Sequence, residues 1–338
     1  MKIKKQTLQN ALSLVKPGLA GKELIEQSTS FAFMGKTVVT YNDEISLSHP
    51  VEGLNIVGAV KADELYQLLS KLKQDEIDVE VTENEIIIVS GKSRAGLTLQ
   101  QEIKLPLDEI TEATDWKRLP SDFIENLTLA RQSCGVDMSR AVLTCVDVSS
   151  KGVMTSSDGF SVFRINPEKP TKQRGYLLPG TIAREVIKLK PIEYCESEGW
   201  VHYKTAEGTV LSCRIFEDKF PSVDNLLPVE GETITFPEKI IEMLDKAGVF
   251  SQREHSLDES ITIQLENKKL KVKSESDNGW YEEEVNLRYT GKPLSFNVTP
   301  QLLQRMLEKT QQCIVSTTIN RIRFETDKWE YIAVLRNA

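Results

Sequence analysis

Ala62-Asp-Glu-Leu-Tyr-Gln-Leu-Leu-Ser-Lys-Leu72 is one of six similar segments whose repetition decides the fold. Its leucines recur at the i, i+3, i+4 and i+7 positions that place apolar side chains on one face of a helix. Five further segments share this pattern, and several carry Ser, Thr, Asp or Pro at the entry, which favours a helix start. We therefore predict amphipathic helices at residues 5–16, 61–76, 121–135, 181–190, 237–247 and 300–312.

The predicted helices begin at nearly constant intervals of about 55 to 63 residues, which indicates an internal repeat. Between them lie short alternating runs typical of β-strands, at residues 37–41, 86–89, 209–216 and 319–324. Each repeat is thus one helix followed by three or four strands. Because one helix cannot cover a four-stranded sheet, we expect neighbouring repeats to pair and to pack helix beside helix.

Pairing of the repeats predicts an α+β protein of three similar domains, each with two helices packed on antiparallel sheets. The boundaries fall in polar connections, so the expected domains are residues 1–114, 115–230 and 231–338. The alternative is that the equal spacing of the helices arises by chance in an unrelated α+β protein.

The composition is that of an ordinary globular protein, with 40% hydrophobic and 27% charged residues in a chain of 338. No apolar run is long enough to span a membrane, and the N-terminal lysines precede no hydrophobic signal region, so we expect a cytoplasmic protein without a membrane partner. Five widely spaced cysteines without a CxxC pair indicate reduced, partly buried thiols. Three scattered histidines argue against a zinc site.

The charge and the motifs restrict the classes of function. A net charge of −8 argues against an unstructured nucleic-acid binder, but not against a protein whose basic residues gather on one surface. The predicted helices are together slightly basic, whereas the rest of the chain is acidic. Because the sequence contains no P-loop, GxSxG elbow or HExxH helix, we predict no catalytic residues, no metal and no cofactor.

Five segments carry a resemblance to a known family. Arg140-Ala-Val-Leu-Thr-Cys-Val146 is similar to an Arg-x-x-Leu-Thr-Gly-Val strand, and Thr155-Ser-Ser-Asp-Gly-Phe-Ser-Val-Phe163 to Ala-Thr-Asp-Gly-His-Arg-Leu. Phe220-Pro-Ser-Val-Asp-Asn-Leu-Leu-Pro228 is similar to Phe-Pro-Asp-Tyr-x-x-Val-Leu-Pro, and Tyr289-Thr-Gly-Lys-Pro-Leu-Ser-Phe-Asn-Val298 to Tyr-x-Gly-x-x-x-x-Ile-x-Phe-Asn-Val. The chain also ends on a strand, Tyr331-Ile-Ala-Val-Leu335. In this order the segments resemble the β subunit of bacterial DNA polymerase III, the bacterial type of DNA sliding clamp.

The sequence departs from the family pattern in two places. Phe160-Ser161 stands where the family has His-Arg, and the ending Val-Leu-Arg-Asn-Ala replaces a Met-Pro-Met type of ending. These departures indicate a distant member and are compatible with a bacteriophage origin.

The resemblance implies a homodimeric ring in which three domains per chain close head to tail with a second copy around duplex DNA. Such a ring is a processivity factor of DNA replication: it binds double-stranded DNA without reading its sequence, tethers a DNA polymerase, is opened by a separate clamp-loader ATPase and is not itself an enzyme. The alternative is a clamp-fold protein-interaction scaffold that no longer encircles DNA. A hydrolase that uses unpaired carboxylates is a further, disfavoured alternative.

The resemblance also implies three sets of site residues. Basic residues on or near the helices are expected to contact DNA phosphates: Lys5, Lys16, Lys22, Arg131, Arg140, Arg184, Lys188, Lys190, Arg253, Arg305 and Lys309. A groove between the second and third domains is expected to take a short partner peptide with aliphatic and aromatic anchors, and it is lined by Leu143, Ser157, Gly159, Phe160, Val162, Pro221, Leu226, Ile319, Val334 and Leu335. The dimer seam is expected to join opposite charges around a small apolar contact, through Lys71, Lys73, Lys92, Arg94, Leu97, Val249, Phe250, Glu282, Glu283 and Glu284.

Each set also has a plainer interpretation. Bases late in a helix follow from the helix dipole alone, groove residues can be ordinary core residues at a domain junction, and the charges of the seam can be solvated faces.

Overall fold

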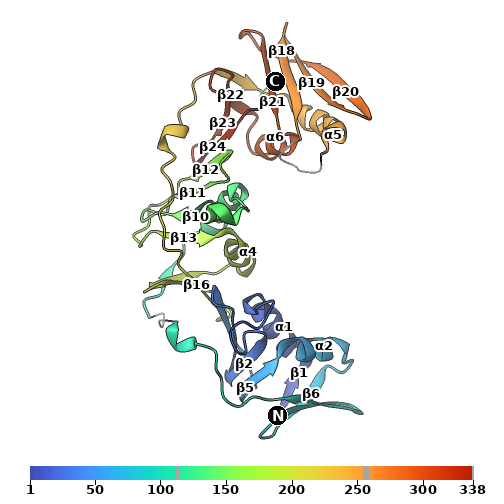
Figure 1. Ribbon diagram of the computed structural model, residues 1–338, viewed down its shortest axis with the longest axis vertical. Coiled ribbons are helices and arrows are strands. Elements are labelled where there is room, and N and C mark those ends of the chain that lie inside the picture. The colour runs from blue at the N-terminus through green and yellow to red at the C-terminus, as the bar shows by residue number, and fades with distance from the viewer. Residues whose placement is uncertain (111–113, 254–258, 337–338) are drawn as a thin grey trace. The chain divides into compact units, whose positions relative to one another are not determined.

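The computed structural model describes residues 1–110, 114–253 and 259–336, which form an α+β fold (Figure 1). The chain divides into two compact units. Unit 1 comprises Met1–Thr128, Ser149–Lys151 and Thr171–Asp218, and unit 2 comprises Leu129–Val148, Gly152–Pro170 and Lys219–Ala338. The residues of the expected middle domain are thus shared between the two units, and the division into three domains stays a prediction.

The periodic helices are confirmed. The described residues contain six α-helices: α1 (Lys5–Val15), α2 (Ala62–Lys71), α3 (Phe123–Ala130), α4 (Gly180–Leu189), α5 (Ile240–Ser251) and α6 (Pro300–Leu307). The first residues of α1, α2 and α4 follow directly on a strand, and no side chain caps these helix starts. The turn of the chain out of a strand, rather than a capping Ser or Thr, therefore sets where these helices begin.

Unit 1 contains one large and one small antiparallel sheet. Its strands are β1 (Lys2–Lys4), β2 (Ser30–Gly35), β3 (Thr37–Tyr41), β4 (Ile45–Pro50), β5 (Ile56–Lys61), β6 (Glu76–Val81), β7 (Glu85–Ser90), β8 (Ser93–Thr98), β9 (Lys117–Arg118), β13 (Tyr176–Pro179), β14 (Glu193–Ser197), β15 (Trp200–Lys204) and β16 (Val210–Arg214). The large sheet has the order β5-β2-β3-β4-β16-β15-β14-β9, and the small one β1-β6-β7-β8. Strands from two repeats far apart in the sequence thus join at the β4–β16 pair, which runs from Ser48 opposite Val210 to Ile45 opposite Cys213.

The apolar stripe of each helix packs on these sheets. In α1, Leu8, Ala11, Leu12 and Val15 are buried, and the helix lies beside α2 and against β3 and β4. These are the positions that the helical period predicted, and burial of such side chains stabilises the fold by about 1.5–3 kcal/mol each for a leucine or valine. Helix beside helix on a sheet is the arrangement expected for paired repeats.

Unit 2 has a related organisation. Its strands are β10 (Cys145–Val148), β11 (Met154–Ser157), β12 (Ser161–Ile165), β17 (Glu232–Thr235), β18 (Ile261–Glu266), β19 (Lys269–Ser276), β20 (Gly279–Asn286), β21 (Leu294–Val298), β22 (Gln312–Ser316), β23 (Arg321–Glu325) and β24 (Trp329–Val334). One sheet has the run β10-β11-β12-β24-β23-β22-β17, and a second has the order β20-β19-β18-β21. Helices α5 and α6 lie side by side, and α5 packs on β19 and β20 (Figure 1).

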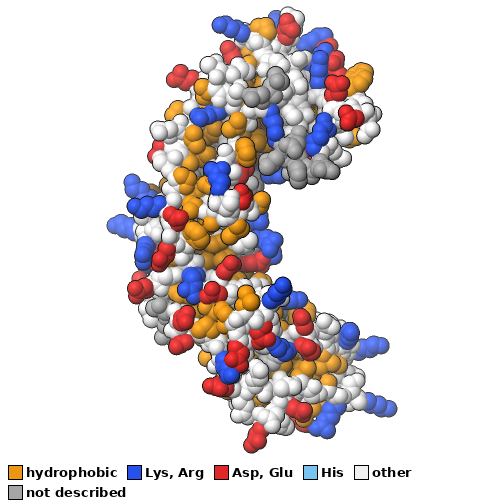
Figure 2. Space-filling model, in the orientation of Figure 1, with side chains coloured by type: hydrophobic (Ala, Val, Ile, Leu, Met, Phe, Trp, Pro, Cys, Tyr) orange, Lys and Arg blue, Asp and Glu red, His pale blue; other side chains and the backbone are white. Residues whose placement is uncertain are grey.

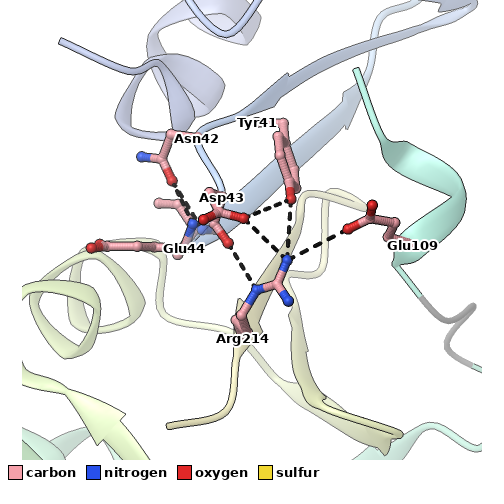
Figure 3. Close-up of polar contacts among 7 residues, drawn as sticks. Tyr41, Asn42, Asp43, Glu44, Glu109 and Arg214 are labelled. Carbon is pink, nitrogen blue, oxygen red and sulfur yellow. Dashed lines mark hydrogen bonds and ion pairs between the residues drawn. The ribbon is translucent and has the colours of Figure 1, made fainter. Parts of the chain in front are cut away.

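The β4–β16 junction of unit 1 is closed by Arg214 at the end of β16 (Figure 3). Its Nε donates to the backbone carbonyl of Asp43 at 3.1 Å, and a terminal nitrogen donates to the Asp43 carboxylate at 3.1 Å and to the Tyr41 hydroxyl at 3.3 Å. The same guanidinium lies 3.7 Å from the Glu109 carboxylate and 5.0 Å from the ring centroid of Trp200. One side chain thereby ties the β3–β4 turn and the chain segment at Glu109 to β16, an interior strand of the sheet.

The five cysteines are free, and all except Cys134 are buried, in agreement with the prediction of unpaired thiols. Burial raises the pKa of the Cys134 thiol to about 12, so this thiol is a poor nucleophile at neutral pH. Across the residues that the structure describes, no helix is both long and apolar enough to cross a membrane.

Candidate functional site

The turn between β11 and β12 is held by Asp158. Its Oδ1 accepts hydrogen bonds from the backbone N–H of Phe160 at 2.8 Å and of Ser161 at 2.6 Å. Gly159, between Asp158 and Phe160, has φ +90°, a conformation that L-residues with a Cβ rarely adopt. The turn fixes the position of Phe160, whose side chain remains 59% exposed.

A pocket of about 430 Å³ lies beside this turn, within unit 2. Phe160 lines it together with Val334 and Leu335 of the C-terminal strand region and with Leu302 and Met306 of α6. The backbone N–H of Val334 donates to the Phe160 carbonyl at 2.9 Å, so β24 and the turn are held in register. A pocket of this size accommodates a few side chains of a bound peptide.

Nine of the ten predicted groove residues fall into three groups in the structure, and the tenth, Gly159, is exposed in the β11–β12 turn. Phe160, Val334 and Leu335 line the pocket. Pro221, Leu226 and Ile319 are exposed without lining it, whereas Leu143, Ser157 and Val162 are buried. Leu143, Ser157 and Val162 therefore have the environment of core residues, which was the plainer interpretation. Figure 2 shows apolar side chains on the surface in the region of β12 and β24.

The segment after Phe220 packs on the same strands. Val223 and Leu227 share a buried cluster with Val162 of β12 and Ile332 of β24. Arg164 of β12 donates to the Asp224 carboxylate at 2.8 Å and so anchors the segment from the strand side. The Phe-Pro motif thus belongs to a segment that is fixed on β12 and β24.

Several residues of the pocket were not predicted from the sequence. They are Gln132, Ser133, Gln301, Leu302, Met306, Asn320, Tyr331 and Arg336, while Arg305 was assigned to DNA instead. Because their assembly depends on how α6 packs beside β12 and β24, no local pattern marks them.

Arg140 is among the predicted DNA ligands, and the structure places it against the Asp158 turn. A terminal guanidinium nitrogen lies 2.7 Å from the position that a Cβ on Gly159 would occupy. Residues 138–144 form short 3-10 turns interrupted at Arg140, which has the non-helical φ of −123°. Arg140 therefore supports the turn that presents Phe160, and a contact with DNA stays a prediction.

The other predicted DNA ligands of unit 1 differ in how free their charges are. The Lys5 ammonium donates to the Leu72 carbonyl at 2.8 Å, beyond the last turn of α2. On α4, Arg184 and Lys188 share the Glu185 carboxylate. Lys16 lies 4.5 Å above the Tyr66 ring. These four cations already have partners within the chain, and Lys22 and Lys190 are exposed.

In unit 2, the Arg253 guanidinium donates to the carbonyls of Gln252 and Glu275. Arg305 is exposed on α6 and is one of the residues that line the pocket, and Lys309 is exposed just beyond α6. Arg131 is partly buried in a short 3-10 helix after α3. The helix faces are therefore only locally basic.

Five of the predicted seam residues lie on β8 or β20, which are the last strands of their sheets. The other five lie near these edges in the sequence or on helices: Lys71 ends α2, Lys73 follows it, Lys92 precedes β8, and Val249 and Phe250 belong to α5. Lys71, Lys73, Lys92 and Arg94 of unit 1 are exposed, and Leu97 on β8 is half-buried. In unit 2, the Phe250 ring packs beside Gly279 at the start of β20, and Val249 is 64% exposed. The neighbouring Trp280 is 71% exposed and was not predicted.

The three glutamates of the seam already have lysine partners within unit 2. Glu282 pairs with Lys271 and Lys273, and Glu284 with Lys269 and Lys271. Glu283, on the other face of β20, pairs with Lys239 and Lys246, and the hydrogen bond from Lys239 is the main reason why its pKa is lowered to about 2. Attraction between these glutamates and the lysines of a second copy would compete with the existing pairs.

No protein-family model matches the chain, and no curated protein does at the level of sequence. Solved structures match it over its full length. The DnaN sliding clamp of Pseudomonas aeruginosa, crystallised with griselimycin, has a TM-score of 0.86 at 18% identity, with 100% of this chain and 99% of that chain covered. The DNA polymerase III beta chain of Streptococcus pneumoniae gives a TM-score of 0.86 at 18% identity, with the same coverage. That of Thermotoga maritima gives 0.83 at 15% identity, also with 100% and 99% covered.

The chain therefore has the fold of the DNA sliding clamps. Within that class, these three matched structures are beta subunits of bacterial DNA polymerase III, which is the resemblance that the sequence motifs indicated.

Proposed function

We propose that this protein is a DNA sliding clamp, a processivity factor that encircles duplex DNA and tethers a DNA polymerase. The observation that carries the proposal is the full-length likeness of its fold to sliding clamps, at a TM-score of 0.86. The ordered motifs around Asp158-Gly159 and Phe220-Pro221 support it independently of the fold.

In the proposed ring, two copies close head to tail through the free edges β8 and β20. Each edge presents unpaired backbone N–H and C=O groups, which favour addition of a strand from another chain. Phe250 and Trp280 supply apolar contact at the unit 2 edge. Each seam of this kind is heterologous, because β8 of one copy meets β20 of the other, and two equivalent seams close the ring.

The proposed DNA contacts are electrostatic and read no sequence. The exposed lysines Lys22, Lys190 and Lys309 and the ring-stacked Lys16 can reach phosphates, and such contacts weaken steeply with salt. Many weak contacts allow the ring to slide. Cations that already have partners in the chain, such as Lys5 and Arg253, contribute less.

The other elements of the proposal follow from the clamp class. The ring performs no chemistry, a separate clamp-loader ATPase opens it, and the polymerase inserts a short peptide into the pocket beside Phe160. The protein acts in the cytoplasm, where a bacterial or phage polymerase meets its DNA.

A topological assay tests the proposal. The protein is loaded onto nicked circular DNA with its clamp loader and passed through a sizing column in 0.3 M salt. We expect it to co-elute with the circle and to be released when one restriction cut makes the DNA linear, because a closed ring can slide off an end. If the protein still co-elutes with the DNA after the cut, or is a stable monomer at micromolar concentration, the proposal is contradicted.

Charge variants separate the clamp from the scaffold alternative, which no observation on the described residues favours. Replacing Lys16, Lys190 and Lys309 together by Gln is expected to lower polymerase processivity and to reduce the salt slope of DNA binding by about 2 to 3. The matched control replaces the exposed Lys36, Lys151 and Lys292 by Gln. If both triple variants support equal processivity, the scaffold is the better interpretation.

A further inference from the structure

The neighbouring helices α1 and α2 share a chain of side-chain contacts that ends at a cation. The Ser13 hydroxyl of α1 donates to the Gln9 carbonyl at 2.8 Å, and its oxygen lies 2.9 Å from the Tyr66 hydroxyl of α2. The Lys16 ammonium lies 4.5 Å above the centroid of the Tyr66 ring, within the range of a cation–π interaction. Side chains of both helices therefore restrain one ammonium group.

The hydrogen bonds of this chain have a fixed direction. Because the Ser13 hydroxyl has one proton and donates it to the Gln9 carbonyl, its oxygen accepts the proton of the Tyr66 hydroxyl. The Tyr66 side chain is half-buried between solvent and the helices, and its hydroxyl end is thus tied to α1. This bond holds the ring of α2 beneath Lys16.

The partner of Lys16 leaves its charge available to an anion. Arg184 and Lys188 share the Glu185 carboxylate, which offsets their charge, whereas the Tyr66 ring is neutral. An ammonium has three N–H donors, so a contact with a ring on one side leaves donors for a phosphate on another. A lysine that is already restrained also loses less side-chain entropy when it binds.

We propose that Tyr66 is a positioning residue, which holds the Lys16 ammonium in place for a DNA phosphate. This proposal rests on the proposed clamp function and adds an uncharged residue to its DNA-binding surface. Tyr66 acts through Lys16 and not by a contact of its own with DNA. Lys16 is exposed directly after the last residue of α1, where the helix dipole also favours a cation.

A double-mutant cycle tests the proposal with the full chain and a labelled linear DNA duplex, whose dissociation constant is measured by fluorescence anisotropy at several salt concentrations. Lys16→Gln is expected to weaken binding and to reduce the salt slope by about 1, the loss of one phosphate contact. Tyr66→Leu is expected to weaken binding by roughly twofold to fivefold, the worth of one cation–π contact, with the salt slope unchanged because no charge is lost. In the Lys16→Gln background, Tyr66→Leu is expected to have no further effect, because no cation is left to position. Tyr66→Phe keeps the ring and is expected to bind more tightly than Tyr66→Leu.

Phe216→Leu is the matched control, since it removes an exposed ring of unit 1 that lies outside the helices, and it is expected to leave the affinity and the salt slope unchanged.

Three results would overturn the proposal. If Tyr66→Leu weakens binding equally with and without Lys16, the ring does not act through the cation. If Tyr66→Leu tightens binding, the ring withholds Lys16 from DNA. If Lys16→Gln leaves the salt slope unchanged, Lys16 meets no phosphate. In each case the clamp function still stands when wild type is retained on nicked circles and released by the cut, whereas loss of that behaviour in wild type contradicts the clamp function and this proposal together.

Discussion

His202 lies in the core of unit 1 with both ring nitrogens in hydrogen bonds, 2.8 Å from the hydroxyls of Ser197 and Ser212. Burial lowers its pKa from 6.5 to about 4. In the unfolded chain the imidazole takes up a proton below about pH 6.5, whereas the folded protein resists it until about pH 4. We therefore expect the free energy of unfolding to fall as pH drops from 6.5 to 4, by up to about 3 kcal/mol from this group alone.

Chemical denaturation at several pH values measures this effect. His202→Gln keeps a polar side chain but does not titrate, so its stability is expected to change less between pH 6.5 and 4 than that of wild type. Parallel pH profiles of the two proteins would show that His202 does not carry the dependence.

Gly159 is the residue on which the geometry of the pocket depends most. Its φ of +90° strains any residue with a Cβ, and a Cβ would also meet the Arg140 guanidinium at 2.7 Å. Gly159→Ala is expected to cost about 1–2 kcal/mol of stability and to displace Phe160, so that peptide affinity falls at least tenfold.

Gly199→Ala is the matched control for that change. Gly199 has a comparable φ of +74°, but a Cβ there meets nothing within 4 Å. We expect a similar loss of thermal stability with unchanged peptide affinity in titrations at 20 °C. A peptide affinity that falls equally in both variants would mean that global destabilisation, not the turn, is responsible.

At the scale of elements, the β4–β16 junction depends on a network rather than on a single ion pair. The Arg214 side chain is 45% exposed, so each of its pairs alone contributes little. Its guanidinium group, however, donates hydrogen bonds to a carbonyl, a carboxylate and a hydroxyl at the same time. We expect Arg214→Lys to lose most of the network, with about 1 kcal/mol of stability, because one ammonium cannot hold these three acceptors.

Hydrogen exchange provides the measurement for this junction. In Arg214→Lys, faster exchange is expected for the amides of β4 and β16 and not for those of β18 and β19. Arg94→Lys is the control, since Arg94 makes a single 3.5 Å contact with Glu80 on an exposed sheet. Equal, negligible changes in the two variants would show that the network adds nothing to strand pairing.

At the scale of the whole molecule, the sequence predicts the periodic parts of the fold and fails where two elements meet. The helical period of Leu8, Leu12 and Val15 is local, so α1 could be predicted from its residues alone. The position of Arg305 at the pocket could not be predicted in this way, because it depends on how α6 packs beside β24. The pairing of the β20 glutamates was predictable in principle, since the hairpin register sets Glu282 opposite Lys273.

That register changes what should hold the proposed ring together. With Glu282, Glu283 and Glu284 neutralised inside unit 2, the seam must rely on strand pairing at the β20 edge and on its apolar contacts, of which Trp280 is the largest. Exposed aromatic residues at such edges are frequent hot spots of association. Trp280→Ala is therefore expected to raise the dimer dissociation constant by roughly tenfold to a hundredfold, as measured by sedimentation equilibrium.

Two comparisons fix the cause of that effect. Leu24→Ala removes another exposed apolar side chain, 92% accessible in a loop of unit 1, and is expected to leave the dimer unchanged. Raising the salt concentration from 0.1 to 0.5 M is expected to weaken the wild-type dimer by less than about threefold, because few unpaired charges meet at the seam. A dimer that tolerates the loss of Trp280 but dissociates in salt would instead show that the basic residues Lys71, Lys73, Lys92 and Arg94 of unit 1 draw the glutamates away from their partners in unit 2.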